Sequence, residues 1–369
     1  MGTSVSECTN NWDELLRLIP GYDPFVDSED FYFCSRTADK AVYFIEHYCK
    51  HVKGEWSGRP IILCDWEKSI IGNVFGWKHK ETHLRRYREV LIYLPRKNGK
   101  SLICSGIALY GLFCDDEPGA EVYCCAAEAE QAKTLFDVAK FSVLNDEELN
   151  DCSNVYEREI RYNDINRLKT LTSDAKSKHG LNAHMVVADE VHAHKSRELI
   201  DTMVTSVASR RQPLIFYVTT ADFDQPSICN EIHDLGCKVR DRIIKMPKFL
   251  PVIYEASLED DWTHPDTWAK ANPGLGTSPK LDYIQTECEK AQATPNYENT
   301  FKRLHLNIKT ESDVKWINTK VWNGCGGSFS EESLHGRPCF GGLDLGVVSD
   351  FTWFSMVFPP HGKIVTGKP

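Results

Sequence analysis

Four consecutive residues, Asn98-Gly99-Lys100-Ser101, have the types needed to hold the phosphates of a nucleotide. A glycine lets backbone N–H groups approach phosphate oxygens, a lysine can reach the β- and γ-phosphates, and a serine hydroxyl can bind Mg²⁺. An apolar run precedes them and a segment of small and apolar residues follows, as expected for a strand and a helix. We therefore predict that residues 98–101 bind phosphate and that Lys100 also neutralises charge during phosphoryl transfer.

This loop departs from the complete pattern G-x-x-x-x-G-K-[ST], because Leu94 stands where the first glycine would be. The helix expected after Gly99 still offers backbone N–H groups in its first turn, and these favour anions. The alternative is a surface loop in which Ser101 caps a helix. The strand before the loop and the helix after it favour the phosphate site.

Two adjacent acids, Asp189 and Glu190, end another apolar run, "HMVVADE". At the C-terminal end of a parallel strand, Asp189 could hold Mg²⁺ through its water shell and Glu190 could orient and deprotonate an attacking water. The alternative is the start of a helix, where Asp and Glu are also favoured. Together with Lys100 upstream, the acids favour a site of nucleotide hydrolysis.

A threonine pair, Thr219-Thr220, ends a third apolar run, "LIFYVTTA". Hydroxyl groups at that place could sense the γ-phosphate and pass the signal onward, although a threonine pair at a strand end is more often a turn. Upstream of the loop, Trp66 could stack on a nucleotide base and Glu67 could hydrogen-bond to it. The alternative for Trp66 is a core aromatic.

The elements that must position these residues alternate between strands and helices from about residue 90 to 220. Apolar strands are predicted at 89–95 and 119–127, and a hairpin is predicted around Asn163-Asp164. Alternating strands and helices predict an α/β fold with a mostly parallel sheet covered by helices on both faces. Ligands of such sheets bind at the C-terminal ends of the strands.

The composition limits the possible classes of protein. The 369 residues are 41% hydrophobic and 26% charged, as in an ordinary globular protein, and no apolar run is long enough to cross a membrane. We therefore expect an intracellular protein without a membrane partner. The 14 cysteines are scattered and form no C-x-x-C motif, which predicts reduced core cysteines. The net charge of −10 excludes nucleic-acid binding by the whole surface, so any DNA contact must be local.

Seven motifs in succession resemble the large terminase subunits of tailed bacteriophages, the ATP-driven motors that package DNA into procapsids. The resemblance spans about residues 55 to 355. The motifs are DWEKSIIGNVFGW, LPRKNGKS, GLNAHMVVADEVHAH, YVTTA, WAKANPGLG, HLNI and GGLDLG.

The resemblance implies a RecA-like ATPase that uses ATP and Mg²⁺. It accounts for Leu94, because the phosphate loop of the family deviates from the standard pattern. It implies residues 98–101 as phosphate and Mg²⁺ contacts, Asp189 as the metal-site acid, Glu190 as the catalytic base and residues 219–221 as the coupling motif. The family usually has Gln at the base-reading position, where this chain has Glu67, which keeps an acceptor but loses the amide donor.

The resemblance also implies a division of the chain into domains. Residues 1–54 are expected to form a helical N-terminal extension, 55–250 the P-loop ATPase core and 251–335 a helical linker or lid. Residues 336–369 are expected to begin an RNase H-like nuclease domain that is incomplete in this chain.

The nuclease domains of the family bind two metal ions through carboxylates. Asp344 matches the first of these carboxylates, and Asp350 lies close behind it. A second divalent-metal site at Asp344 is expected only if the domain is completed, because one carboxylate cannot build a two-metal site. We therefore do not expect this chain alone to cut DNA.

A catalytic arginine could stabilise the charge of the transition state. Arg158, or Arg161 on the same hairpin region, could be supplied to a neighbouring subunit in a ring, and Arg96 could act within its own chain. An ordinary surface arginine is the alternative in each case. The basic stretches 78–88 and 238–248 could hold the DNA backbone, although solvated helix faces have the same composition.

The sequence thus predicts an ATP-hydrolysing motor subunit that moves viral double-stranded DNA. Its expected partners are the portal, a small terminase subunit and further copies of itself in a ring, and its expected place is the cytoplasm of the infected bacterial host. One alternative is a P-loop nucleic-acid helicase or translocase, which would require a second RecA-like domain after about residue 250. Another is an inactive remnant that acts as a binding module.

Overall fold

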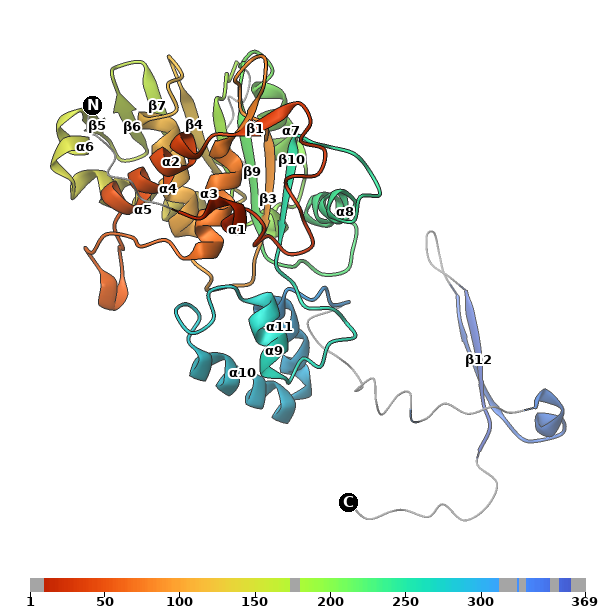
Figure 1. Cartoon of the computed structure of the whole chain (residues 1–369). Coiled ribbons are helices and arrows are strands. Elements are labelled where there is room, and N and C mark those ends of the chain that lie inside the picture. The colour runs from red at the N-terminus through yellow and green to blue at the C-terminus, as the bar shows by residue number, and fades with distance from the viewer. Residues whose placement is uncertain (1–9, 173–179, 312–323, 325–329, 346–351, 360–369) are drawn as a thin grey trace. The chain divides into compact units, whose positions relative to one another are not determined.

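The computed structural model describes residues 10–172, 180–311, 324, 330–345 and 352–359 (Figure 1). By their internal contacts, residues 1–315 form one compact unit and residues 316–369 form a second.

Eight strands form the central sheet of the first unit among the described residues. They are β3 (Glu89–Tyr93), β4 (Glu121–Ala126), β5 (Ser153–Val155), β6 (Glu159–Tyr162), β7 (Asn166–Thr172), β8 (Met185–Ala188), β9 (Leu214–Thr219) and β10 (Phe249–Ile253). Their order across the sheet is β10-β3-β9-β8-β4-β7-β6-β5. The strands from β10 to β7 pair in parallel, and β6 and β5 extend one edge in antiparallel fashion. The mostly parallel sheet predicted from the sequence is confirmed.

The predicted hairpin is also present. Strands β6 and β7 pair antiparallel, with Tyr162 opposite Asn166. Asn163 and Asp164, the residues at the turn, both have positive φ angles, 50° and 58°. Asn and Asp tolerate this left-handed conformation better than other non-glycine residues, which explains why they stand at the turn.

Helices cover both faces of the sheet (Figure 1). Side chains of β3 alternate between the two cores, with Val90 and Ile92 in one and Leu91 and Tyr93 in the other. Strands with apolar residues on both faces form the nearly continuous apolar runs seen in the sequence. The first core is closed by α2 (Ser35–Tyr48), α3 (Asp65–Gly76), α4 (Lys100–Phe113) and α5 (Ala129–Leu144), and the second by α7 (Glu198–Ser206) and α8 (Ile228–Arg240).

Short elements complete this part of the chain. Helix α1 packs against α3, and β1 pairs antiparallel with β2. Phe75 and Trp77 lie fully inside the first core. The short elements are α1 (Trp12–Leu15), β1 (Phe31–Phe33), η1 (Gly54–Trp56), β2 (Trp77–His79), α6 (Glu147–Asp151) and η2 (Val191–Ala193).

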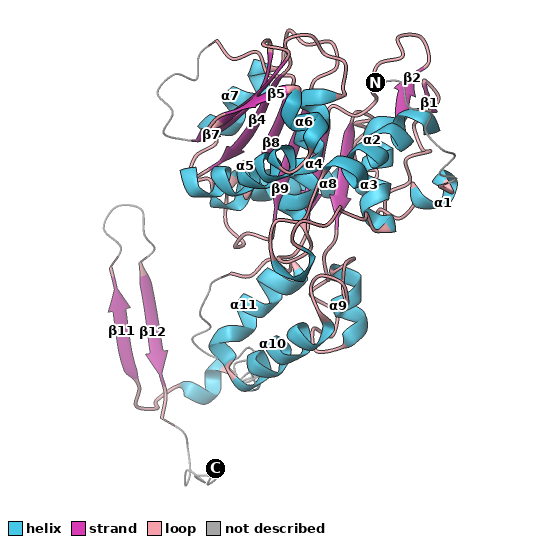
Figure 2. Cartoon of the chain, turned by 90° about the vertical axis from the view of Figure 1, so that its left-hand side faces the viewer, coloured by secondary structure: helices cyan, strands magenta, loops and turns pink. Residues whose placement is uncertain are grey.

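Three helices after β10 form a cluster of their own beside one end of the sheet (Figure 2). They are α9 (Pro265–Ala271), α10 (Leu281–Ala293) and α11 (Pro295–Leu306). Trp268, Ile284 and Phe301, one from each helix, are buried in their shared core. In the second unit, β11 (Phe340–Asp344) and β12 (Trp353–Val357) pair antiparallel, after η3 (Glu331–Leu334). None of the helices in the described part of the chain is long and apolar enough to cross a membrane.

Both interpretations of stretch 78–88, a stretch that holds the DNA backbone and a solvated helix face, are wrong for its central arginines. The stretch begins in β2 and continues as a loop, and Arg85 and Arg86 are 3% and 1% exposed. The Arg86 guanidinium donates to the backbone carbonyl oxygens of Pro24 and Pro247. Neither arginine can therefore reach a DNA phosphate.

Arg85 instead belongs to a buried ionic network. Its guanidinium donates to both carboxylate oxygens of Asp115, at 2.8 and 3.0 Å, and His184 Nε2 lies 2.6 Å from the same carboxylate. Burial alone would raise the pKa of Asp115, but Arg85 and His184 outweigh burial and lower it to about 2. The network connects Asp115, which follows α4, to His184, which precedes β8, and to Arg85, which precedes β3.

We predict that Asp115→Asn destabilises the fold by about 3 kcal/mol, because it leaves a buried guanidinium without its counter-charge. Because the folded pKa of Asp115 is depressed, its contribution is full above the pKa of the unfolded chain, near 3.8, and is lost as pH falls toward about 2. Urea unfolding between pH 7 and pH 2 measures this. The difference in free energy of unfolding between wild type and variant should become smaller below about pH 4. A difference that does not change with pH would contradict the role of Asp115 as the ionised partner of Arg85.

Candidate active site

The parallel pairing of β3, β9 and β8 brings three loops to one edge of the sheet. Residue Tyr93 pairs with Thr219, and Ala188 pairs with Tyr217, so the three strands end almost level. The Leu94 N–H donates to the Thr219 carbonyl oxygen at 3.1 Å, which extends this alignment into the loop after β3. The groups predicted from the sequence at the ends of the three strands therefore lie at the same edge.

The loop from Leu94 to Gly99 turns directly into α4. Gly99 is the N-cap residue of the helix and has φ 71°, a left-handed conformation that costs glycine nothing and strains other residues. Ser101 is half-buried in the first turn. First-turn N–H groups have no partners within a helix, so this end of α4 can bind an anion.

The side chain of Lys100 is buried at this helix start. Its Nζ donates to the carbonyl oxygens of Leu94 and Pro95, at 2.8 and 3.0 Å. Burial lowers the pKa of Lys100, while the negative charges of Glu190 and Asp189 act in the opposite direction. Binding a phosphate through Lys100 requires its ammonium group to exchange these carbonyl oxygens for phosphate oxygens.

Asp189 and Glu190 follow β8 at the same edge. Asp189 is 6% exposed, and its Oδ1 accepts from the Glu190 N–H at 2.9 Å. Burial and the negative charge of Glu190 together raise the pKa of Asp189 to about 7. A cation between these carboxylates and the loop would relieve this cost, so the pair fits a Mg²⁺ site.

Glu190 is held in a strained conformation with a free oxygen. Its φ of 48° is unusual for a glutamate, and residues in such conformations concentrate at functional sites. Its Oε2 is buried without a hydrogen bond, although His192 Nδ1 lies only 3.2 Å away. A fixed carboxylate oxygen that makes no hydrogen bond of its own is suited to accept one from a water molecule.

His192 is a residue of this site that the sequence did not single out. Its backbone N–H donates to Thr219 Oγ1 at 3.2 Å, and its Nδ1 lies 3.1 Å from Thr219 Oγ1 and 3.4 Å from Thr220 Oγ1. Burial lowers the pKa of His192, so its ring is neutral at pH 7. The ring nitrogen Nδ1 therefore lies between the Glu190 carboxylate, 3.2 Å away, and both predicted threonine hydroxyls. Its position two residues after Glu190 was the only signal of this role in the sequence.

Trp66 and Glu67 lie in the first turn of α3. The Trp66 ring packs in the main core, 6.1 Å from the ring of Tyr254, and its Nε1 is buried without a partner. Glu67 Oε2 accepts from the Cys64 N–H at 2.7 Å, and Glu67 Oε1 lies 3.8 Å from where a side chain at Gly99 would begin. Burial raises the pKa of Glu67 to about 7.

The side chain of Asn98 bonds both to its own loop, where Nδ2 lies 3.4 Å from the carbonyl oxygens of Pro95 and Arg96, and to the helical cluster. Its Nδ2 donates to Asn272 Oδ1 at 2.8 Å, and its Oδ1 accepts from the Gly274 N–H at 3.3 Å. A second link joins the end of β9 to this cluster, because Asn307 Oδ1 accepts from the Ala221 N–H at 3.0 Å. Neither asparagine was singled out from the sequence, although Asn272 lies in the motif WAKANPGLG and Asn307 lies in the motif HLNI.

The three predicted arginines are all exposed, and only Arg96 lies on the phosphate loop. Arg96 is exposed on the loop, and Arg158 is exposed between β5 and β6. Arg161 is also exposed, and its Nε donates to Glu159 at 2.9 Å. Five strand spacings separate β6 from β3, about 24 Å at 4.8 Å each, so Arg158 cannot reach the phosphate loop of its own chain.

The acids predicted for a nuclease lie in the second unit. Asp344 is exposed at the end of β11, opposite Trp353 of β12. Asp350 lies outside the described residues.

A parallel sheet with a lysine-containing loop before a helix, and an acid pair and a threonine pair on neighbouring strand ends, defines the RecA-like P-loop class of ATPase folds. Comparisons with known proteins narrow this class. Residues 65–235 match the family model for the ATPase domain of the terminase large subunit, and residues 244–366 match that for its endonuclease domain. The chain belongs to the terminase large subunit family, which confirms the resemblance found in the sequence.

Individual relatives agree with this assignment. The large terminase subunit of Enterobacteria phage HK97 is 26% identical over 321 residues, which cover 85% of this chain and 61% of that protein. Protein YmfN of Escherichia coli strain K12 is 30% identical over 167 residues, 45% of this chain and 37% of that protein. The crystal structure of the HK97 large terminase has the same fold, with a TM-score of 0.65, 24% identity, and coverage of 88% of this chain and 65% of that one. The chain thus spans about three fifths of the length of its HK97 relative.

We predict that Asp189→Asn stabilises the folded protein above neutral pH, by on the order of 2 kcal/mol, because it removes a buried charge that Glu190 repels. The folded pKa of Asp189 is raised, so the wild type loses stability as pH rises from near 3.8 to about 7, and the advantage of the variant grows over that range. Thermal unfolding without divalent cations measures this.

The exposed Asp137 on α5 provides the matched control, since Asp137→Asn should leave stability nearly unchanged. Equal stability of Asp189→Asn and wild type at pH 8 would show that the Asp189 carboxylate carries no burial cost.

Proposed function

We propose that the chain is an ATP-hydrolysing motor subunit that moves viral double-stranded DNA into procapsids. The observation that carries this proposal is the convergence of Lys100, the pair Asp189-Glu190 and the pair Thr219-Thr220 at the ends of three neighbouring strands. Membership of the terminase large subunit family supplies the DNA-packaging context.

The phosphate loop and the acid pair divide the work of ATP hydrolysis. Lys100 leaves the carbonyl oxygens of its own loop and binds the β- and γ-phosphates, next to the first-turn N–H groups of α4. Ser101 and Asp189 would hold Mg²⁺, which would neutralise phosphate charge. Glu190 orients a water molecule and accepts its proton through the unbonded Oε2.

The base of ATP would be read at the start of α3. The raised pKa of Glu67 means that its carboxyl is protonated in part at neutral pH, and a protonated carboxyl offers the donor that a Gln side chain would supply. Trp66, at the same helix start, packs in the core and could stack on the base only after its ring leaves Tyr254.

The change in the phosphates is transmitted through the threonines and two asparagines. His192 connects Glu190 to Thr219 and Thr220, so a change at the base moves the end of β9. Asn307 then carries the change from Ala221 to α11. Asn98 connects the phosphate loop to Asn272 in the same helical cluster, which makes the cluster a receiver for both halves of the site.

Assembly would complete the site. Arg158 lies at the end of the sheet where the parallel strands have their C-termini, as the phosphate loop does, although several strands separate the two. The reason is that the turn before β6 adjoins the C-terminal half of β7. From there Arg158 could reach the site of a neighbouring copy in a ring, and Arg96 is the candidate within the chain. The proposed partners are double-stranded DNA, the portal and the small terminase subunit, in the cytoplasm of an infected bacterium. In the second unit, Asp344 is the candidate ligand of a second metal site, for nuclease chemistry.

Two other functions compete with this proposal. A helicase would use the same ATP site, but the described part of residues 254–311 forms a helical cluster without a second RecA-like sheet. An inactive binding module would lack ATP turnover, and Lys100, Asp189 and Glu190 argue against it. A strand-displacement assay separates the helicase from the packaging motor.

We predict that Glu190→Gln lowers the rate of ATP hydrolysis by at least about 100-fold while nucleotide affinity stays close to that of wild type, because only proton transfer is lost. Lys100→Ala should lose both hydrolysis and binding. Phosphate release with and without DNA measures the rate of hydrolysis, and titration with a fluorescent nucleotide measures the affinity. Glu128→Gln, on an exposed residue, is the control; normal turnover by Glu190→Gln would refute the assignment of the base.

We predict that Asn307→Gly uncouples hydrolysis from DNA while leaving basal turnover within about twofold. Asn307 has φ 55°, which glycine adopts without strain, so the substitution removes only the amide that links Ala221 N–H to the Tyr254 carbonyl oxygen. The measurement is the ratio of ATPase rates with and without DNA, which should fall toward one. Unchanged stimulation by DNA would exclude Asn307 from the path.

A further inference from the structure

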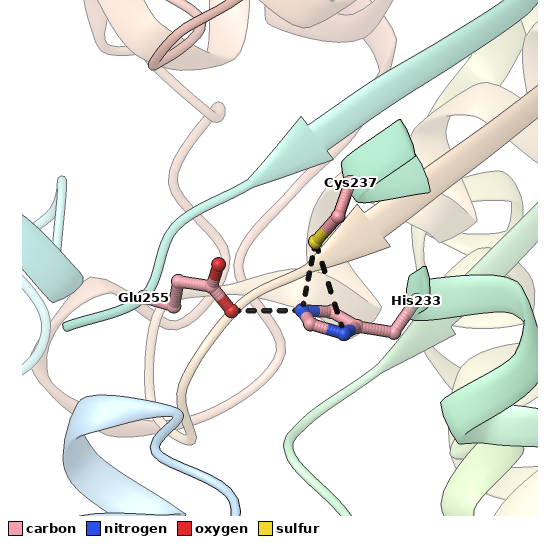
Figure 3. A group of neighbouring side chains, drawn as sticks. All are labelled: His233, Cys237 and Glu255. Atoms are coloured by element: carbon pink, nitrogen blue, oxygen red, sulfur yellow. Dashed lines mark hydrogen bonds and ion pairs between the residues drawn. The ribbon is translucent and has the colours of Figure 1, made fainter. Parts of the chain in front are cut away.

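Three side chains that can bind a metal converge away from the ATP site. His233 and Cys237 lie one turn apart on α8, and Glu255 follows the end of β10 (Figure 3). His233 Nε2 lies 2.8 Å from Glu255 Oε2 and 3.6 Å from Cys237 Sγ. One ligand atom from each residue lies within 4.8 Å of the ligand atoms of the other two. After small side-chain rotations, a single ion could therefore lie about 2.0–2.3 Å from all three atoms.

The surroundings fix two of the three ligands as a metal site would require. His233 Nδ1, on the other side of the ring, lies 3.5 Å from Asp234 Oδ1, which accepts from Lys309 Nζ at 2.9 Å. A carboxylate beside this nitrogen can orient a metal-binding imidazole. The second oxygen of Glu255 accepts from the Arg240 guanidinium at 3.0 Å, which turns Oε2 toward the cluster. The ring of Tyr93 packs against His233, with centroids 4.3 Å apart.

The donors also determine the class of ion. Nitrogen, thiolate sulfur and carboxylate oxygen together suit Zn²⁺ and similar transition-metal ions rather than Mg²⁺ or Ca²⁺, which prefer oxygen alone. A thiolate and a carboxylate balance the two positive charges. His233 is 7% exposed and the Glu255 side chain is 24% exposed, so the cluster is shielded yet open to water on one side.

We propose that His233, Cys237 and Glu255 form a binding site for one Zn²⁺-type ion, with a fourth position left for water. Such an ion would join α8 to the segment between β10 and the helical cluster. The next residue, Ala256, donates its N–H to the Leu306 carbonyl oxygen at 2.9 Å, so the ion would anchor the base of that cluster. This proposal is independent of ATP hydrolysis.

Titration with Co²⁺ tests the site directly. The whole chain, freed of metals by dialysis against a chelator, should bind Co²⁺ with the near-ultraviolet absorption of a thiolate–cobalt bond. Cys237→Ser should lose that band and weaken binding by at least about 100-fold, since loss of even an outer partner costs 10–100-fold. Asp234→Asn should keep the band but weaken binding by about tenfold.

Cys152→Ser, a partly buried thiol elsewhere in the first unit, is the matched control and should bind Co²⁺ as wild type does. Zn²⁺ should compete with Co²⁺ and raise the melting temperature of wild type but not of Cys237→Ser. If His233 and Glu255 form only an ion pair and no metal binds, no thiolate–cobalt band will appear in wild type or in any variant. That result, or equal bands in wild type and Cys237→Ser, would overturn the proposal.

Discussion

The proposed site depends on the contacts of one buried ammonium group, that of Lys100, with its neighbouring carbonyl oxygens and carboxylates. Lys100 lies inside the protein at the end of the central sheet, where a positive charge is costly unless its hydrogen bonds and counter-charges are supplied. Two loop carbonyl oxygens supply the hydrogen bonds, and the Glu190 carboxylate, joined by Asp189 once it is ionised, supplies the negative charge. Burial, together with the charge of Glu190, raises the pKa of Asp189 to about 7. The site is thus prepared for a ligand that brings phosphate oxygens to the lysine and a cation to the acids.

The same edge of the sheet explains how chemistry could produce movement. Two buried asparagines of the helical cluster bond to this part of the site: Asn272 to the phosphate loop and Asn307 to the end of β9. The loop is also held by the Arg96 N–H, which donates to the Leu304 carbonyl oxygen at 2.9 Å. A change in the distance between these two attachment points would tilt the cluster relative to the sheet. Long-range coupling of this kind needs an element with two arrangements, and the helical cluster, with a core of its own, is suited to be that element.

Local patterns in the sequence were sufficient for the parallel sheet, the hairpin at Asn163-Asp164 and the residues at three strand ends. Nearly continuous apolar runs mark strands that are buried on both faces, and the C-terminal ends of parallel strands meet at one end of the sheet. The arginines at 85 and 86 were misread, because a basic run looks exposed when the buried carbonyl oxygens and Asp115 that surround it are far away in the chain. The links through Asn272 and Asn307 were missed for the same reason. The His233–Cys237 pair had a signal, its spacing of one helical turn, but Glu255 joins it only through the fold.

The central claim is that residues 94–101 hold the phosphates of ATP, and a structure of the chain with a non-hydrolysable ATP analogue and Mg²⁺ tests it most directly. The account predicts that Lys100 Nζ leaves the carbonyl oxygens of Leu94 and Pro95 and lies within hydrogen-bond distance of the γ-phosphate, with the metal ion between Ser101 and Asp189. A nucleotide bound elsewhere, or phosphates at the loop with Lys100 still bonded to both carbonyl oxygens, would contradict it.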